Sequence, residues 1–173
     1  MVKVSLRLIV LGAIAIGLIL ATSLGVAAAN PWVGKTAPDF SLQTLEGKTV
    51  TLNELKGKPV LLNFWACRCP HCQAEMSYFQ EVYTELKDKE LEIIGVNIKE
   101  SAQEVSAYMD QNGYSLPVCL DTDGAVADSY GVRLLPSTYF IDKDGVIQEV
   151  VIAPFESKDD IINKLSKIID LNS

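Results

Sequence analysis

The sequence predicts an α/β domain in which a mixed central sheet carries helices on both faces. Nearly continuous apolar runs at residues 60–66 and 91–98 indicate strands that are buried on both faces. Helical apolar patterns follow each of these runs, and near the C-terminus two apolar segments flank a short turn. Strand and helix alternation that ends in a hairpin is typical of a mixed sheet.

Length, composition and charge restrict the possible functions. The chain has 173 residues and is 49% hydrophobic, which is enough for one domain with a proper core. Residues 30–173 carry a net charge of −9, which disfavours nucleic acid as a partner. A single histidine and four cysteines exclude most zinc sites, and we predict neither a metal nor a cofactor.

The N-terminal segment has the features of an export signal. Lys3 and Arg7 precede an apolar run over residues 8–29, which as a helix would span roughly 33 Å, enough for a bilayer core. Because the basic charge precedes the run, the body is expected outside the cytoplasm. Residues 1–29 are therefore predicted to anchor the protein in the cell membrane, or alternatively to be a cleaved signal peptide that releases it. Residues 30–38 would form a connector and residues 39–173 the folded domain.

The first half of the domain is predicted to begin with a β-hairpin, whose strands at 39–45 and 49–52 flank Glu46-Gly47-Lys48. One helical turn at 53–55 and the buried strand 60–66 follow. Pro70 then begins a helix, because its missing N–H costs nothing at the first helical position. The apolar stripe of this helix consists of Met76, Phe79, Val82, Tyr83 and Leu86.

The second half continues the alternation after strand 91–98. Ser101 and Glu104 form a capping box for a helix that ends near Asn112-Gly113. A strand at 116–120 and a short helix at 124–130 follow, and strands at 137–141 and 146–152 form the late hairpin. The last helix is predicted over residues 157–171, with an apolar face made of Ile161, Ile162, Leu165, Ile168 and Ile169.

Cys69 and Cys72 carry the strongest chemical signal in the chain. Their spacing brings the two sulfurs close enough to bond. Cys69 lies between a buried strand and a helix, where free N–H groups and the helix dipole favour a thiolate. Cys72 lies one turn into the helix, shielded as a resolving thiol would be. Cys-x-x-Cys in this context indicates thiol–disulfide exchange.

The surrounding motifs resemble a known family. Asn63-Phe64-Trp65-Ala66-x-x-Cys69-Pro70-His71-Cys72 resembles the active-site segment of thioredoxin-like proteins. Over roughly residues 35–170 the chain is similar to the membrane-tethered ResA/TlpA type of thiol-disulfide oxidoreductase in the AhpC/TSA-redoxin superfamily. The matching motifs are Ala37-Pro38-Asp39-Phe40, Leu55-Lys56-Gly57-Lys58, Cys72-Gln73-Ala74-Glu75, Leu116-Pro117-Val118 and Leu135-Pro136-Ser137-Thr138. The resemblance implies a thioredoxin fold with an extra N-terminal β-hairpin and a central helix–strand insert.

The resemblance also implies roles for residues around the dithiol. Pro136 is expected to be cis and to face the dithiol, which leaves backbone groups beside it and Leu135 free to pair with an extended substrate. Trp65 is expected to be a second substrate contact. Glu75 matches a family glutamate that is tied to proton handling and substrate choice, the alternative being a solvated helix carboxylate. Asn63 stands where thioredoxin has an ionisable aspartate.

Three residues beside the cysteines are expected to tune their acidity. Arg68 would place a cation next to Cys69 and lower its pKa, unless it points away as a surface arginine. His71 can donate towards the Cys69 thiolate, which would make the couple more oxidising. Pro70-His71 is the pair found in DsbA-type oxidants, so this dipeptide and the family resemblance point to opposite directions of electron flow.

Two further cysteines leave alternatives open. Cys67 could bind a soft metal such as Cu(I) together with Cys69, Cys72 and His71. Cys119 is expected to be a buried structural thiol, with a Cys67–Cys119 disulfide as the alternative.

The sequence therefore predicts an extracytoplasmic thiol-disulfide oxidoreductase that the segment 8–29 tethers to the membrane. The expected substrates are exported proteins with a disulfide, such as apocytochrome c, and a membrane thiol donor would re-reduce the Cys69–Cys72 pair. The first alternative is a DsbA-like oxidant that works with a membrane acceptor, and the second is a copper-binding module. A thiol peroxidase is disfavoured because no threonine lies between Phe64 and Cys72.

Overall fold

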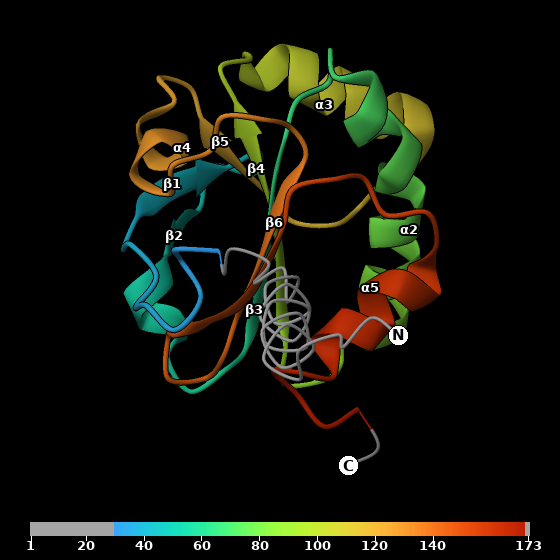
Figure 1. Ribbon diagram of the computed structural model, residues 1–173. Coiled ribbons are helices and arrows are strands. Elements are labelled where there is room, and N and C mark those ends of the chain that lie inside the picture. The colour runs from blue at the N-terminus through green and yellow to red at the C-terminus, as the bar shows by residue number, and fades with distance from the viewer. Residues whose placement is uncertain (1–29, 172–173) are drawn as a thin grey trace, which may run out of the picture. The chain divides into compact units, whose positions relative to one another are not determined.

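The structure, a computed structural model, describes residues 30–171 (Figure 1). The predicted membrane segment 8–29 lies outside the described residues. Within residues 30–171, no helix combines the length and apolar character that a membrane span requires. Within the described part of the chain, residues 31–171 belong to one compact unit.

A seven-stranded mixed sheet lies at the centre of this unit, in the order β2-β1-β5-β4-β3-β6-β7. The central strand β3 runs parallel to β4 and antiparallel to β6. Both early hairpin strands join the same sheet, because β1 pairs with β5 on one side and β2 on the other. The strands are β1 (Ser41–Thr44), β2 (Thr49–Thr51), β3 (Val60–Trp65), β4 (Glu92–Ile98), β5 (Val118–Asp121), β6 (Ser137–Ile141) and β7 (Ile147–Val151).

Helices cover both faces of the sheet, as the sequence predicts (Figure 1). One face is covered by α2 (Pro70–Leu86), α3 (Ala102–Asn112) and α5 (Lys158–Leu165). The other face is covered by the 3₁₀ turn η1 (Leu52–Leu55), by α4 (Ala125–Ser129) and by the chain at 37–40. The insert formed by α3 and β5 follows β4 and extends the sheet to the N-terminal hairpin.

The buried strand β3 divides the core between these two faces. Its side chains alternate, so that Leu61 and Trp65 belong to the α2 side while Leu62 and Phe64 belong to the α4 side. All six residues of β3 are buried, which agrees with its continuous apolar sequence. Asn63 is the one polar residue of this strand, and the alternation points it to the α2 side.

Several element boundaries differ from the sequence prediction, and two of the differences have a direct physical reason. The short strand starts at Val118 rather than at Leu116, because Pro117 has no N–H to donate to a neighbouring strand. The last α-helix ends at Leu165 rather than at Leu171, where the Ile168 N–H bonds the Leu165 carbonyl three residues back (2.9 Å). Ile168 and Ile169 still pack against the core, so the predicted apolar contact continues beyond the helix.

The segment predicted as a connector packs onto the domain. The Gly34 N–H donates to the Ile147 carbonyl (2.8 Å), and Thr36 forms an antiparallel bridge with Val146. The Trp32 ring stacks at 6.5 Å from that of Tyr130. Trp32 is therefore a loop residue that covers the edge of the domain.

Candidate active site

Cys69 and Cys72 lie where the central strand passes into a helix. β3 ends at Trp65 and α2 begins at Pro70, with Cys69 as the N-cap residue. The Cys69 sulfur accepts a hydrogen bond from the Cys72 N–H (3.2 Å), as a capping side chain does. Cys69 is half-buried and Cys72 is fully buried, and all four cysteines are free thiols in this structure. Cys69 is therefore the more accessible of the two thiols, at the N-terminus of a helix, and the burial of Cys72 suits a resolving thiol.

A loop from the opposite part of the chain faces this dithiol. The Leu135–Pro136 peptide bond is cis, as the family resemblance implies. The Cys69 Sγ donates to the Leu135 carbonyl oxygen at 3.8 Å, which brings the loop before β6 into contact with the reactive cysteine. Pro136 is buried, whereas the neighbouring Leu134 is 67% exposed. A large apolar side chain is thus presented to solvent one residue before the carbonyl that Cys69 contacts.

Glu75 lies fully buried on α2, three residues after Cys72. Its Oε1 accepts a hydrogen bond from the Asn63 side-chain amide (3.0 Å), and its Oε2 accepts one from the Phe155 N–H (2.9 Å). The same Asn63 amide also donates to Thr138 Oγ1 on β6 (3.0 Å). The alternative of a solvated helix carboxylate is therefore wrong, because this side chain has no contact with solvent.

Burial is the main cause of the pKa shifts of Glu75 and Cys72. It raises the pKa of Glu75 to about 7, against two hydrogen bonds that favour the carboxylate. Burial also raises the pKa of the Cys72 thiol, and the neighbouring Cys69 and Glu75 raise it further. Near neutral pH, Glu75 can therefore exchange a proton while Cys72 retains its own until it is needed.

A second carboxylate, Glu100, contacts the loop that precedes Cys69. It follows β4, and its side chain is 8% exposed. Its Oε2 accepts from the Cys67 N–H (2.7 Å), and its Oε1 accepts from the Arg68 N–H (3.1 Å). The Arg68 guanidinium forms an ion pair with it at 2.9 Å. Glu100 therefore binds the backbone of the two residues that precede the reactive cysteine.

The three predicted tuning residues occupy different positions. The Arg68 guanidinium forms an ion pair with Glu100 and donates a hydrogen bond to the Ile98 carbonyl. Its positive charge is therefore paired with a carboxylate. His71 and Pro70 are exposed on the first turn of α2. The two residues of the oxidant-like dipeptide thus reach solvent, in the turn that joins Cys69 to Cys72.

Trp65 does not lie where a substrate could touch it. The side chain is fully buried, and its ring packs 5.5 Å from that of Tyr108. A Cβ at Gly95 on β4 would lie 2.9 Å from its Nε1, so a glycine is needed beside it. The expected substrate contact is corrected accordingly, because odd-numbered residues of β3 point beneath α2 and α3 and make Trp65 a core residue.

The structure also shows the surroundings of the other two cysteines, Cys119 and Cys67. Cys119 is fully buried in β5, as expected for a structural thiol. Cys67 is half-buried and accepts from the Asn97 amide at 3.8 Å. Across residues 30–171, no cluster of three or more His, Cys, Asp or Glu residues is arranged to hold a metal ion.

Several residues belong to the site although nothing in the sequence indicates that they do. Asn97 and Glu100 lie more than 25 residues after Cys69 and contact its loop only because β4 pairs with β3. The Phe155 N–H comes from the segment before α5, and Thr138 lies opposite Asn63 in the sheet. Only the polarity of Asn63 within an otherwise apolar strand could have indicated this cluster.

The chain is similar to proteins of known type. The AhpC/TSA family matches residues 33–150. The thiol-disulfide oxidoreductase ResA of Bacillus thuringiensis (strain Al Hakam) is 40% identical over 136 residues, which cover 79% of this chain and 78% of the relative. ResA of Geobacillus thermodenitrificans is 38% identical, also over 136 residues, with 79% and 78% covered.

A solved structure shows the same fold. It is the thioredoxin domain of a thiol-disulfide oxidoreductase from Bacteroides vulgatus, which is 28% identical to this chain with a TM-score of 0.68. The match covers 80% of this chain and 98% of that domain. The thioredoxin fold implied by the motifs around Cys69 is thereby confirmed.

Proposed function

Because the chain belongs to the AhpC/TSA family and is a thiol-disulfide oxidoreductase, we propose that it reduces disulfides of exported proteins through Cys69 and Cys72. The observation that carries this proposal is the placement of the two sulfurs. Cys69 is half-buried at a helix N-terminus and contacts the Leu135 carbonyl, while Cys72 is buried one turn later. An accessible attacking thiol and a shielded resolving thiol are what sequential disulfide exchange requires.

The reaction begins when the Cys69 thiolate attacks one sulfur of the substrate disulfide. A Cys69–substrate bond forms, the substrate disulfide breaks, and the first substrate sulfur leaves as a thiolate that takes up a proton. The Cys72 thiol then loses its proton and attacks Cys69. A Cys69–Cys72 disulfide forms, the Cys69–substrate bond breaks, and the second substrate sulfur leaves as a thiolate that takes up a proton. The two electrons of the dithiol have then passed to the substrate.

Glu75 is the acceptor that we propose for the Cys72 proton. It lies on the same helix, is fully buried, and has a pKa of about 7 because of burial. Asn63 and the Phe155 N–H hold its two oxygens and so orient the carboxylate. A carboxylate that titrates near neutral pH is suited to general base catalysis under these conditions.

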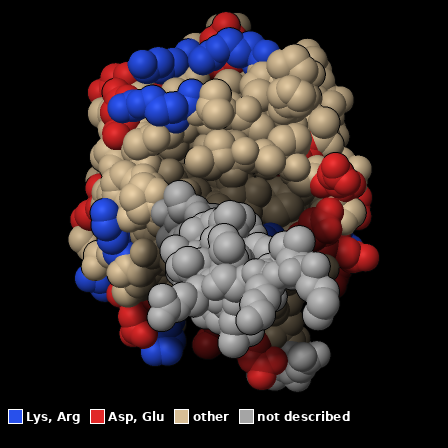
Figure 2. Space-filling view, viewed as in Figure 1, with Lys and Arg blue, Asp and Glu red and all other residues tan. Residues whose placement is uncertain are grey.

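The surface beside Cys69 supports a protein substrate. Leu134 is exposed next to the cis peptide, one residue before the carbonyl that Cys69 contacts. Separately, one face of the molecule has a broad uncharged area with Lys and Arg along its upper edge (Figure 2). We propose an extended segment of an exported protein, such as apocytochrome c, as the partner of this loop. Residues 8–29 would tether the domain outside the cytoplasm, and a membrane thiol donor would return the electrons.

The opposite direction of electron flow is the second candidate, and Pro70-His71 favours it. The pair occupies the first turn of α2, where a histidine can donate towards a thiolate at the N-cap. Stabilising that thiolate stabilises the reduced protein and makes the couple more oxidising.

The reduction potential of the Cys69–Cys72 pair in the full-length chain decides between the two directions. Equilibration in redox buffers of defined potential should yield a value near or below about −250 mV for a reductase. A value above roughly −150 mV would identify an oxidant instead. In parallel, a Cys72→Ser variant should trap substrates as mixed disulfides on Cys69, and the matched Cys119→Ser variant should not.

A further inference from the structure

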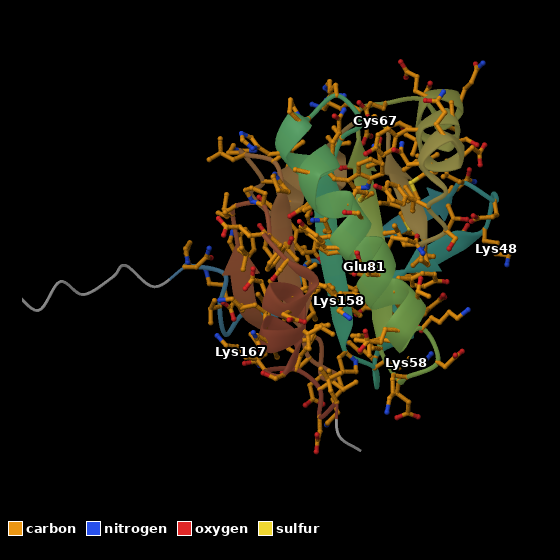
Figure 3. The ribbon with its side chains drawn as sticks, turned by 90° about the vertical axis from the view of Figure 1, so that its right-hand side faces the viewer. Lys48, Lys58, Cys67, Glu81, Lys158 and Lys167 are labelled. Carbon is orange, nitrogen blue, oxygen red and sulfur yellow. The ribbon has the colours of Figure 1, made fainter. Side chains whose placement is uncertain are left out.

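Three thiols lie within six residues at the start of α2, at positions 67, 69 and 72. Cys67 is half-buried and packs against the same core cluster as Cys69. Figure 3 shows it at the upper end of the molecule, between the start of α2 and α3. Three thiols can form three different disulfides. If exchange uses Cys69 and Cys72 alone, something must prevent Cys67 from forming a disulfide with either of them.

Glu100 holds Cys67 and its neighbour through several contacts. Its carboxylate accepts the backbone N–H groups of Cys67 (2.7 Å) and Arg68 (3.1 Å), and it accepts the Asn97 side-chain amide at 2.7 Å. The same Asn97 amide lies 3.8 Å from the Cys67 sulfur. On the other side of the loop, the Gln73 side-chain amide donates to the Cys67 carbonyl. Both backbone groups of Cys67 are therefore occupied.

The backbone before Glu100 has an unusual conformation. Lys99 has a φ of 57°, the only positive φ of a non-glycine residue in the described part of the chain. This left-handed conformation is unfavourable for lysine and persists only where the surrounding structure imposes it. Its N–H bonds the Asp121 carbonyl (3.0 Å), which fixes the turn that delivers the Glu100 side chain to the Cys67 loop.

Burial and the charge of Glu100 together keep the Cys67 thiol protonated. Burial of the Cys67 thiol, followed by its interaction with the Glu100 carboxylate, raises the pKa of Cys67 to about 12. Burial opposes ionisation of Glu100, but hydrogen bonds from Asn97 and the two backbone N–H groups outweigh it and lower its pKa. Near neutral pH, a fixed anion therefore faces a thiol that retains its proton.

We propose that Glu100 is a positioning residue that fixes the backbone preceding Cys69 and keeps the Cys67 thiol out of disulfide exchange. The inference rests on the proposed exchange through Cys69 and Cys72. The reaction that Glu100 suppresses is attack by Cys67 on Cys69 in the Cys69–Cys72 disulfide. In that exchange a Cys67–Cys69 bond forms, the Cys69–Cys72 bond breaks, and the proton lost by Cys67 passes to the Cys72 thiolate, with no net oxidation.

The test compares Glu100→Gln with the wild type in the full-length chain, and Glu81→Gln on the exposed face of α2 is the matched control. Brief alkylation of the reduced proteins at pH 8, with mass spectrometry of each cysteine peptide, measures Cys67 reactivity. Loss of the Glu100 charge should increase Cys67 alkylation about tenfold, as a decrease of one pKa unit would. After oxidation, disulfides that contain Cys67 should appear in Glu100→Gln and be absent from Glu81→Gln and the wild type.

A second substitution tests whether the effect of Glu100→Gln comes from Cys67 or from a general loss of folding. In Glu100→Gln combined with Cys67→Ala, the Cys69–Cys72 disulfide should again be the only product. Unchanged Cys67 alkylation and a single Cys69–Cys72 disulfide in Glu100→Gln would overturn the inference while leaving the proposed function intact. Absence of the Cys69–Cys72 disulfide in the oxidised wild type would overturn the proposed function itself.

One measurement does not depend on the stability of Glu100→Gln. The pH dependence of Cys67 alkylation in the Cys69→Ser, Cys72→Ser double variant keeps Glu100 in place. Cys67 should still resist alkylation at pH 9, whereas a transition near the ordinary thiol value of about 8.5 would contradict the inference.

Discussion

Two carboxylates lie near the dithiol, one fully buried and one partly buried, and their surroundings shift their pKa values in opposite directions. Glu75, on α2, accepts hydrogen bonds from two neutral groups, and burial raises its pKa to about 7. Glu100, beside the loop before Cys69, accepts from two backbone N–H groups, an amide and a guanidinium, and its pKa is lowered despite burial. The number and charge of the donors, rather than burial alone, therefore decide which carboxylate can exchange protons and which remains an anion.

The largest expected effect comes from Glu75→Gln, which keeps the shape of the side chain and removes its titration. If Glu75 accepts the Cys72 proton, the wild-type reduction rate should rise with pH through about 7, and the variant should lose this rise. Loss of a general base at this position should slow turnover about 100-fold above pH 7. Insulin reduction measured from pH 5.5 to 8.5 checks this, and an unchanged profile would contradict the role of Glu75.

The same variant should change the stability profile. The raised pKa means that the folded state favours protonated Glu75, so this contribution is complete below about pH 4.5 and is lost as pH rises through about 7. Relative to Glu75→Gln, the wild type should therefore lose about 3 kcal/mol of unfolding free energy across this window. Urea denaturation at several pH values measures the difference.

Glu100→Gln should show the reverse dependence. The lowered pKa means that the stability contributed by Glu100 is present above its unfolded pKa and is lost as pH falls through the folded value. At pH 7 the variant should unfold about 2 kcal/mol more easily than the wild type, because charged hydrogen bonds to the backbone are lost. The two proteins should converge in acid, and a constant difference at every pH would show that the carboxylate charge is unimportant.

Asn63→Asp makes the surroundings of Glu75 even less favourable for a second charge. A carboxylate at this position would lie within about 3 Å of Glu75, and like charges at that distance do not ionise together. The inflection of the rate profile should move upward by about one pH unit, which corresponds to about 1.4 kcal/mol. Asn163→Asp on the exposed face of α5 is the control and should leave the inflection near pH 7.

The smallest effect is expected for Arg68→Gln. The Arg68 side chain is more than half exposed, so its ion pair with Glu100 should contribute less than about 1 kcal/mol. Asn97 and the two backbone N–H groups would still hold the carboxylate. A loss of stability as large as that of Glu100→Gln would show that the ion pair, and not the backbone contacts, maintains the anion.

The sequence by itself determined the local features of this protein. The spacing of Cys69 and Cys72, Pro70 at the first helical position and the capping box at Ser101 all depend on interactions within a few residues. The buried strands were recognisable because a strand that is covered on both faces needs a continuous apolar run. The motif around Pro136 indicated a cis peptide only through the family resemblance.

Tertiary structure alone decided how these features are surrounded. Glu75 accepts from Phe155, which is 80 residues away, and Glu100 accepts from Cys67 across 33 residues. The burial of Trp65 likewise depends on Gly95 of the neighbouring strand and on Tyr108 of α3. Such contacts have no local signature, because the order of strands in the sheet sets them, and with them the donors that decide which carboxylate stays charged.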